Sequence, residues 1–357
     1  MRRKSFAVAA GLLAAVTGLA QAQNDKKDDI SFKTFDGVLI KGSFYPSGKG
    51  ANAPVVMFLH KLGSDRTKGD WNALAEELQK EGYAVLSFDF RGHGQSKTIL
   101  EPDKFWNYSM NVNHLNIRDR KKKVINYTDF KNSYLPCLVN DIVAARYDLD
   151  NRNDSGQCNT SNIIVIGAED GAALGLLWMA TEHARAAVYQ KVNLFQINGG
   201  NNAMAAEDLA GAIWLTFSRN VHGPKGTMNF PFQALVGPGS QIAPTLRDRV
   251  PMWFAVGQND KEGLNDANYL YDTILKADSA KIKLDTTFKK PIAGTNLRGA
   301  ALLGKANLST DDDIKKYIKK LVEKRPNAAP KKRNASESEP TQVPLPLFGF
   351  GNNYSYP

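Results

Sequence analysis

Two short segments carry carboxylates at places where a reactive group could be presented. Gly167-Ala168-Glu169-Asp170-Gly171 stands between an apolar run at residues 163–166 and a longer apolar stretch at 172–183, and Asp260 ends the run Val256-Gly257-Gln258-Asn259-Asp260. Hydrolysis through a covalent intermediate needs a nucleophile, an imidazole that takes its proton and a carboxylate that orients the imidazole. Glu169 and Asp260 are therefore the first candidates, and the imidazoles available to them belong to His60, His93, His114, His183 and His222.

Strands and helices alternate along the chain, and their ends place these candidates. Apolar and alternating runs predict strands at residues 30–35, 38–45, 55–59, 84–90, 163–166, 192–197, 250–256 and 281–288. Helical spacing predicts helices at residues 71–80, 134–149, 172–183, 267–275 and 312–322. Asp36-Gly37 between the first two strands is a strong hairpin signal. The pattern predicts an α/β fold with a mostly parallel central sheet, in which Glu169 and Asp260 both follow strands.

Four motifs resemble the α/β-hydrolase superfamily, in particular its serine hydrolases and dienelactone hydrolases. They are Leu59-His60-Lys61-Leu62-Gly63-Ser64, Phe88-Asp89-Phe90-Arg91-Gly92-His93-Gly94-Gln95-Ser96, the segment ending at Gly171, and the segment ending at Asp260. The resemblance covers about residues 30–323. It implies the α/β-hydrolase fold, with a mostly parallel central sheet, an N-terminal β-hairpin and helices on both faces. It also implies that backbone N–H groups near Lys61 or Leu62 and at Asp170 form an oxyanion-type site.

The same resemblance shows which catalytic parts are missing. The position of the nucleophilic serine is Glu169, whose side chain is one methylene longer than the aspartate nucleophile of some relatives. The histidine of the family follows the acid, but no histidine lies beyond Asp260, and residues 291–299 read PIAGTNLRG. A nucleophile without a base is not activated. Helix-terminal carboxylates also satisfy free backbone N–H groups, which is the simpler role for Glu169 and Asp170, whereas capping and orienting stay equally open for Asp260.

The N-terminus has the features of an export signal. Residues 1–22 combine Arg2, Arg3 and Lys4 with a short apolar stretch and an Ala20-Gln21-Ala22 cleavage motif. We expect this signal peptide to be removed, leaving a periplasmic or secreted protein without a transmembrane segment. The formal net charge of the chain is +10, but residues 1–22 and 324–357 each carry +3, which leaves +4 between them. This balance and the lack of a nucleic-acid-binding motif argue against nucleic acid as a partner.

The remaining chain divides into one domain and a tail. Residues 23–323 are predicted to form the α/β-hydrolase-like domain, with irregular insertions at about 97–131 and 199–249. The first insertion contains a dense basic run, Arg118 to Lys123, which we interpret as a solvated loop that could also touch a phosphate. Residues 324–357 are proline-rich, basic and polar, and are predicted to be disordered.

Two cysteines, Cys137 and Cys158, are predicted to form a disulfide because export leads to an oxidising compartment.

We identify no metal site and no cofactor motif. Two functions are open. One is a catalytically inactive, exported α/β-hydrolase-fold protein that binds an unknown small molecule or peptide, and the other is a hydrolase of an ester or peptide bond with relocated catalytic residues.

Overall fold

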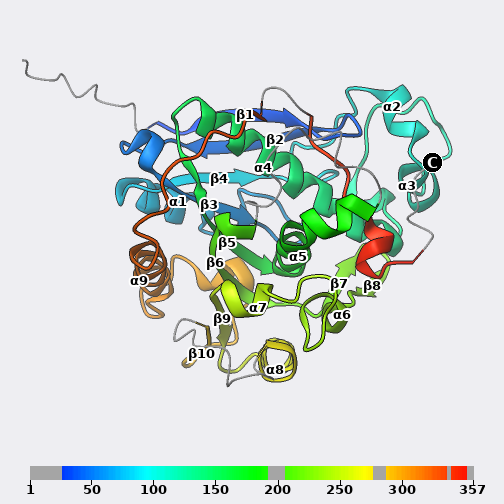
Figure 1. Ribbon diagram of the computed structural model, residues 1–357. Helices are drawn as coiled ribbons and strands as arrows, with labels where there is room; N and C mark the ends of the chain where they lie inside the picture. The colour runs from blue at the N-terminus through cyan, green and yellow to red at the C-terminus, as the bar shows by residue number, and fades with distance from the viewer. Residues whose placement is uncertain (1–25, 192–205, 276–286, 336–338, 352–357) are drawn as a thin grey trace, which may run out of the picture.

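An eight-stranded sheet organises the part of the chain that the structure describes, residues 26–191, 206–275, 287–335 and 339–351 of a computed structural model (Figure 1). Its strands are β1 (Asp28–Lys33), β2 (Leu39–Tyr45), β3 (Pro54–Leu59), β4 (Ala84–Phe88), β5 (Asn159–Glu169), β6 (Leu209–Phe217), β9 (Met252–Gly257) and β10 (Phe288–Ile292). Their order is β1-β2-β4-β3-β5-β6-β9-β10. The β1–β2 and β2–β4 pairs are antiparallel, and every later pair is parallel. The predicted fold class, a mostly parallel sheet with an N-terminal hairpin, is confirmed.

Helices cover both faces of this sheet. They are α1 (Trp71–Lys80), α2 (Pro102–Asn107), α3 (Ser109–His114), α4 (Val139–Asp154), α5 (Asp170–Lys191), α6 (Phe232–Val236), α7 (Leu246–Arg249), α8 (Lys261–Asn268) and α9 (Thr310–Glu323). Alternate side chains of a strand point to opposite faces. In β3, Met57 and Leu59 therefore join the core under α4 and α5, whereas Val56 and Phe58 join the core under α1 and α9. Strands buried on both faces explain the continuous apolar runs in the sequence.

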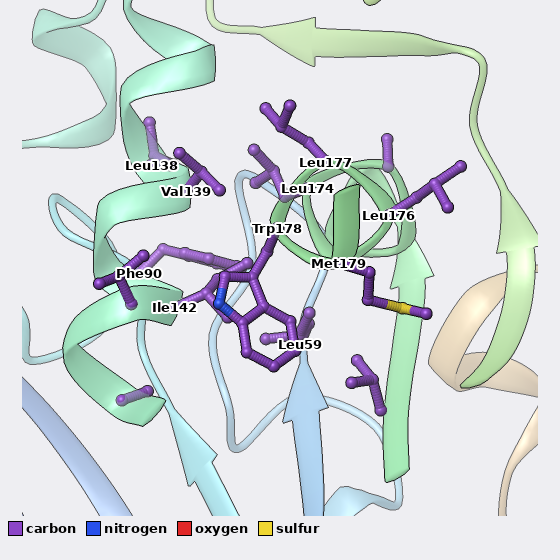
Figure 2. Packing of buried hydrophobic residues seen from close by; sticks show 14 of the residues in the cluster. Leu59, Phe90, Leu138, Val139, Ile142, Leu174, Leu176, Leu177, Trp178 and Met179 are labelled. Atoms are coloured by element: carbon purple, nitrogen blue, oxygen red, sulfur yellow. The ribbon is translucent and has the colours of Figure 1, made fainter. Parts of the chain in front are cut away.

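Helix α5 runs through the larger of the two cores. Its residues from Ala172 to Ala180 are all buried, which agrees with the apolar stretch at 172–183 in the sequence. Figure 2 shows Trp178 of α5 close to Ile142 of α4 and Leu59 of β3. The helix that follows Glu169 is thus held rigidly against the sheet, and so is the turn at its N-terminus.

A buried ionic cluster joins the hairpin, the sheet and α4. Arg91, which follows β4, is 1% exposed and lies between two carboxylates. Its Nη1 donates to Asp36 Oδ2 at 2.7 Å, and its Nε donates to Asp141 Oδ1 at 2.7 Å. The hydroxyl of Tyr134 accepts a further hydrogen bond from Nη1 at 3.0 Å. Because buried charges are tolerated only when they are fully paired, this cluster fixes the turn after β4 in one position.

The central strand β6 was assigned to irregular chain by the sequence pattern, and this is wrong. Residues 209–217 form β6, between β5 and β9, inside the segment predicted as an insertion at 199–249. Glycine weakens a strand signal, and Gly211 makes a close contact here, since a Cβ atom would lie 2.5 Å from a terminal methyl group of Leu321 of α9. After β6 come the hairpin β7 (Asn220–Gly223) and β8 (Gly226–Asn229), then α6 and α7. The predicted strand at 192–197 and most of that at 281–288 lie outside the described residues.

The insertion at 97–131 is ordered rather than irregular. It contains α2 and α3, and Phe105, Met110 and Phe130 are buried in the larger core. Residues 1–22, the predicted signal peptide, lie outside the described residues. Within the described ranges, the structure contains no helix with the length and apolarity that a membrane crossing needs.

The predicted disulfide is not formed, because the two cysteines flank a long helix. Cys137 and Cys158 are both free and buried. Cys137 lies just before α4 and Cys158 just after it, and 16 helical residues span about 24 Å. A disulfide needs Cα atoms within about 7 Å. Instead, Cys137 Sγ lies 3.7 Å from Met110 Sδ, and Cys158 Sγ lies 3.6 Å from the carbonyl oxygen of Leu149.

The C-terminal tail packs on the domain, which contradicts the predicted disorder. Figure 1 shows it, in orange to red, running from α9 past α4 towards β7 and β8. The guanidinium of Arg333 donates to Asp208 at 2.9 Å, and the N–H of Val343 donates to Asn140 of α4 at 2.8 Å. Val343, Leu345 and Phe348 are fully buried in the larger core. Buried apolar surface and these polar links offset the entropy lost on ordering a proline-rich segment.

Removing one tail side chain should therefore destabilise the whole domain. Phe348→Ala should lower the free energy of unfolding by about 3 kcal/mol, as for other buried phenylalanines. Urea unfolding followed by tryptophan fluorescence measures this. Leu100→Ala, at a side chain that is 49% exposed, should change it by less than about 1 kcal/mol. Equal, small effects of the two substitutions would show that the tail is dispensable.

Candidate functional site

A strained turn presents Glu169 at the end of the sheet. Glu169 ends β5 with a φ of 50°, a left-handed conformation that non-glycine residues seldom adopt, and α5 begins at the next residue. The flanking glycines are required by close approach. A Cβ on Gly167 would lie 2.7 Å from the Cα of Ala172, and a Cβ on Gly171 would lie 2.4 Å from the carbonyl oxygens of Leu59 and His60. Such strain is concentrated at functional sites, because it aims one side chain outward.

The Glu169 carboxylate lies between two cations. Its Oε1 is 3.4 Å from Lys61 Nζ, and its Oε2 is 4.0 Å from Arg298 Nε. The glutamate side chain is 16% exposed, whereas those of Lys61 and Arg298 are 51% and 29% exposed. Gly299 packs against the carboxylate, since a Cβ there would lie 2.6 Å from Oε1. The Glu169 carboxylate is therefore positioned by ionic contacts with Lys61 and Arg298.

Arg298 also reaches the second candidate, Asp260. Its Nε lies 3.2 Å from Asp260 Oδ2, and its Nη1 donates to Glu262 at 2.5 Å. Asp260 in turn caps α8, because its Oδ1 accepts the N–H of Gly263 at 3.0 Å. The structure thus shows the first of the two roles that the sequence left open, because Asp260 caps α8. The residue that Asp260 faces is Arg298 and not a histidine.

The charge of Arg298 is fixed. Burial alone would lower the pKa of this guanidinium, but the hydrogen bond to Glu262 and the charges of Asp260, Glu262 and Glu169 raise it above its ordinary value. A guanidinium has no acceptor atom and stays protonated in proteins. Arg298 can therefore orient or neutralise carboxylates, but it cannot take a proton from a nucleophile.

A small cleft of about 180 Å³ opens beside these side chains. It is lined by His60, Lys61, Ser64, Lys68, Gly69, Trp71, Ala168, Glu169, Arg298, Ala300 and Ala301. Three cationic side chains and one carboxylate thus surround an apolar patch made by Trp71 and the alanines. This composition suits a small ligand with an anionic group.

The oxyanion-type site is expected on backbone N–H groups near Lys61 or Leu62 and at Asp170, and this stays a prediction. The side chains of the three residues have different surroundings. Lys61 lines the cleft. Leu62 is buried, 5% exposed, in the larger core, and the Asp170 side chain is engaged elsewhere. Asp170 Oδ1 accepts the backbone N–H of His222 at 2.8 Å and lies 2.8 Å from its Nδ1. The hydrogen bond to Asp170 raises the pKa of His222, although partial burial acts against it.

Two other histidines near the cleft are structural. His60 Nε2 accepts the N–H of Phe90 at 3.1 Å, and its Nδ1 lies 2.7 Å from the carbonyl oxygen of Lys61. Burial lowers the pKa of His60 to about 4, so the ring is neutral at pH 7. His93 Nδ1 lies 2.9 Å from the carbonyl oxygen of Arg91, and burial lowers its pKa to about 3. Both rings connect backbone segments and do not hydrogen-bond to Glu169 or Asp260.

Comparison with solved structures now decides the fold. The alpha/beta hydrolase GrgF from Penicillium sp. superposes with a TM-score of 0.50 at 12% sequence identity, over 83% of this chain and 98% of GrgF. The chain has the α/β-hydrolase fold. An esterase from Pyrococcus furiosus matches with a TM-score of 0.48 at 15% identity, over 83% of this chain and 91% of its own. A dienelactone hydrolase from Anabaena variabilis matches with a TM-score of 0.46 at 14% sequence identity, over 83% of this chain and 97% of its own. No protein-family profile and no curated protein sequence matches the chain.

The resemblance of the sequence motifs leads us to expect a nucleophile after β5, an acid after β9 and a histidine after β10, the last of the described strands. These places are occupied by Glu169, Asp260 and Arg298. The sequence predicted the first two positions. The sequence does not reveal the role of Arg298, although residues 291–299 include it, because its contacts with both carboxylates depend on the fold.

The structure also bears on metal binding, and it adds two residues to the cleft that the sequence did not predict. Among the described residues, the structure brings together no cluster of three or more histidine, cysteine, aspartate or glutamate side chains suited to a metal ion. Lys68 and Trp71 line the cleft but were not predicted. The nearest signal is their position between the motif that ends at Ser64 and the predicted helix at 71–80.

The buried neutral histidines should make the protein sensitive to acid. Burial also lowers the pKa of His183 on α5 to about 4. Below an unfolded pKa of about 6.5 the unfolded chain binds protons that the folded chain refuses, so stability falls as the pH falls towards 4. Each such group costs about 2 kcal/mol at about pH 5. In His183→Met, the loss of unfolding free energy between about pH 7 and pH 5 should therefore be smaller by that amount.

Urea unfolding at the two pH values measures this difference. His222→Gln is the matched control, because the pKa of His222 is raised and its contribution to stability is present at low pH and lost as the pH rises. An identical pH dependence in wild type and His183→Met would contradict the assignment of a buried neutral ring.

Proposed function

We propose that this protein is a catalytically inactive α/β-hydrolase-fold protein that is exported and binds a small molecule or peptide in the cleft beside Glu169. The observation that carries the proposal is the ionic chain Glu169–Arg298–Asp260. It occupies the three positions at which this fold places nucleophile, base and acid. A carboxylate replaces the serine, and a permanent cation replaces the base.

The chemistry of these three side chains supports inactivity. A carboxylate that attacked a substrate would leave its contacts with Lys61 and Arg298, which lie 3.4 and 4.0 Å away. An ester formed on Glu169 would then need a base to activate water, and Arg298 cannot accept a proton. The same charges suit binding, because cations beside an apolar patch attract a ligand with an anionic group.

Export forms part of the proposal and rests on the sequence of residues 1–22. A basic start, a short apolar stretch and a small-residue cleavage motif are typical of a signal peptide. On this proposal the mature protein is periplasmic or secreted. Its two thiols remain reduced because α4 separates them, not because of the compartment.

A specific observation favours the alternative, a hydrolase with relocated catalytic residues. His222 and Asp170 form an imidazole–carboxylate pair beside the turn at Glu169, with 2.8 Å between Nδ1 and Oδ1. The imidazole side chain is 47% exposed, so that it could meet a substrate. This pair resembles two thirds of a catalytic triad, but Nδ1 of the ring hydrogen-bonds to Asp170 and not to a serine.

Activity measurements separate the two functions. The wild-type protein should neither react with a fluorophosphonate probe nor hydrolyse a nitrophenyl ester above background. Glu169→Ser alone should stay inactive, since the new serine lacks a base. Glu169→Ser combined with Arg298→His should be at least about tenfold faster than Glu169→Ser, because a general base contributes about 10²–10⁴ in rate.

The matched control is Arg298→His alone, which supplies a base without a serine. Ester hydrolysis by the wild-type protein that is lost in His222→Ala would establish the relocated active site and overturn the proposal.

Ligand binding is tested by a thermal-shift screen of carboxylate-bearing small molecules and short peptides on the mature protein. A ligand at 100 times its Kd should raise Tm by about 5 °C, because binding to the native state alone stabilises it. Lys61→Ala combined with Lys68→Ala should abolish the shift, and Lys316→Ala combined with Lys319→Ala on α9 should not. A shift that is unchanged in the cleft variant would place the ligand elsewhere.

A further inference from the structure

A second concave surface lies on the insertion, away from the cleft. This groove, with a volume of about 410 Å³, is lined by Val112, Leu115, Asn116, Ile117, Arg118, Arg120, Lys131 and Lys225. Lys225 belongs to the turn between β7 and β8, about one hundred residues further along the chain than the other seven. The fold therefore gathers the four cations around one groove. The basic run at 118–123 is largely exposed, as a solvated loop should be, and contributes Arg118 and Arg120 to this groove.

The charge of the groove is not compensated by its lining. Among the described residues that line it, four are basic and none is acidic. The nearest acid in sequence, Asp119, turns its carboxylate to its own backbone, where Oδ1 accepts the N–H of Lys121 at 2.8 Å. By contrast, Arg66 and Arg91 in the buried parts of the molecule face Asp89 and Asp36. Uncompensated charges in a concavity attract anions.

Two of the four cations are held in place by neutral groups. Arg120 Nη2 donates to the carbonyl oxygen of Val112 at 3.2 Å, and its guanidinium lies 5.2 Å from the centre of the Trp106 ring. Lys131 Nζ donates to the carbonyl oxygen of Asn113 at 2.7 Å. Carbonyl and aromatic contacts orient a cation without cancelling its charge. The groove is thus organised before a ligand arrives, which lowers the entropy cost of binding.

We propose that this groove binds a phosphoryl group. Two guanidinium groups present the forked N–H pairs that match the oxygens of a phosphate, and two ammonium groups add point charges. Four positive charges are balanced best by a group with more than one negative charge. A volume of about 410 Å³ exceeds that of one phosphate ion and leaves room for the molecule that carries it.

Two sources of the phosphoryl group are separated by the test. Pyrophosphate represents a soluble ligand, and phosphatidylcholine vesicles with and without phosphatidic acid represent a lipid headgroup. Binding of pyrophosphate to the full mature protein is measured by calorimetry at low salt, and binding of vesicles is measured by co-sedimentation. We expect one of the two probes to bind, and phosphatidylcholine alone not to bind.

The groove variant is Arg118→Gln combined with Lys225→Gln, which should weaken binding of that probe at least about tenfold, since charge-assisted hydrogen bonds are lost. Both side chains are exposed, so that the variant should keep its Tm. Lys316→Gln combined with Lys319→Gln is the control of equal charge change and should bind as the wild type does. Absence of binding to both probes, or equal weakening in the two variants, would overturn the proposal. The single variant Lys225→Glu provides a second reading, because it reverses one charge at the tip of the hairpin.

Discussion

The buried charge cluster around Arg91 is the interaction on which the site depends. Arg91 is held by Asp36 and Asp141, and it fixes the turn that begins at Phe90. The N–H of Phe90 donates to His60, and the other nitrogen of that ring contacts the carbonyl oxygen of Lys61. Lys61 in turn lies against Glu169. A series of short contacts thus connects the centre of the molecule to the cleft. His60 must stay neutral, because its Nε2 can accept the N–H of Phe90 only when it carries no proton.

The main features of the fold followed from the sequence because they depend on local patterns. Runs such as Val55 to Leu59 are apolar on both faces, and the glycines around Glu169 mark a tight turn. The predictions from the sequence were wrong where contacts between distant parts of the chain determine the structure. Gly211 interrupts a strand pattern to admit Leu321, and Cys137 and Cys158 are near in sequence but are separated by a helix. Neither fact can be read from a window of a few residues.

In the candidate site, too, local patterns could be predicted from the sequence, whereas contacts between distant residues could not. The positions of Glu169 and Asp260 could be predicted, because each follows a strand whose end the sequence marks. The role of Arg298 could not, since it depends on distances to two carboxylates from other parts of the chain. The backbone at Glu169 is strained, and the side chain that it presents is charged. A scaffold that aims one side chain outward is useful for holding a ligand as well as for attacking one.

Because the C-terminal tail contributes to the larger core, the order of synthesis affects when this core can form. Val343, Leu345 and Phe348 complete the larger core, and Arg333 joins the starts of β5 and β6. A ribosome releases the N-terminal strands before residues 343–348, so that this core stays open until those residues have emerged. The larger core therefore closes only after α9 and the tail have been synthesised, although its first strands are complete much earlier.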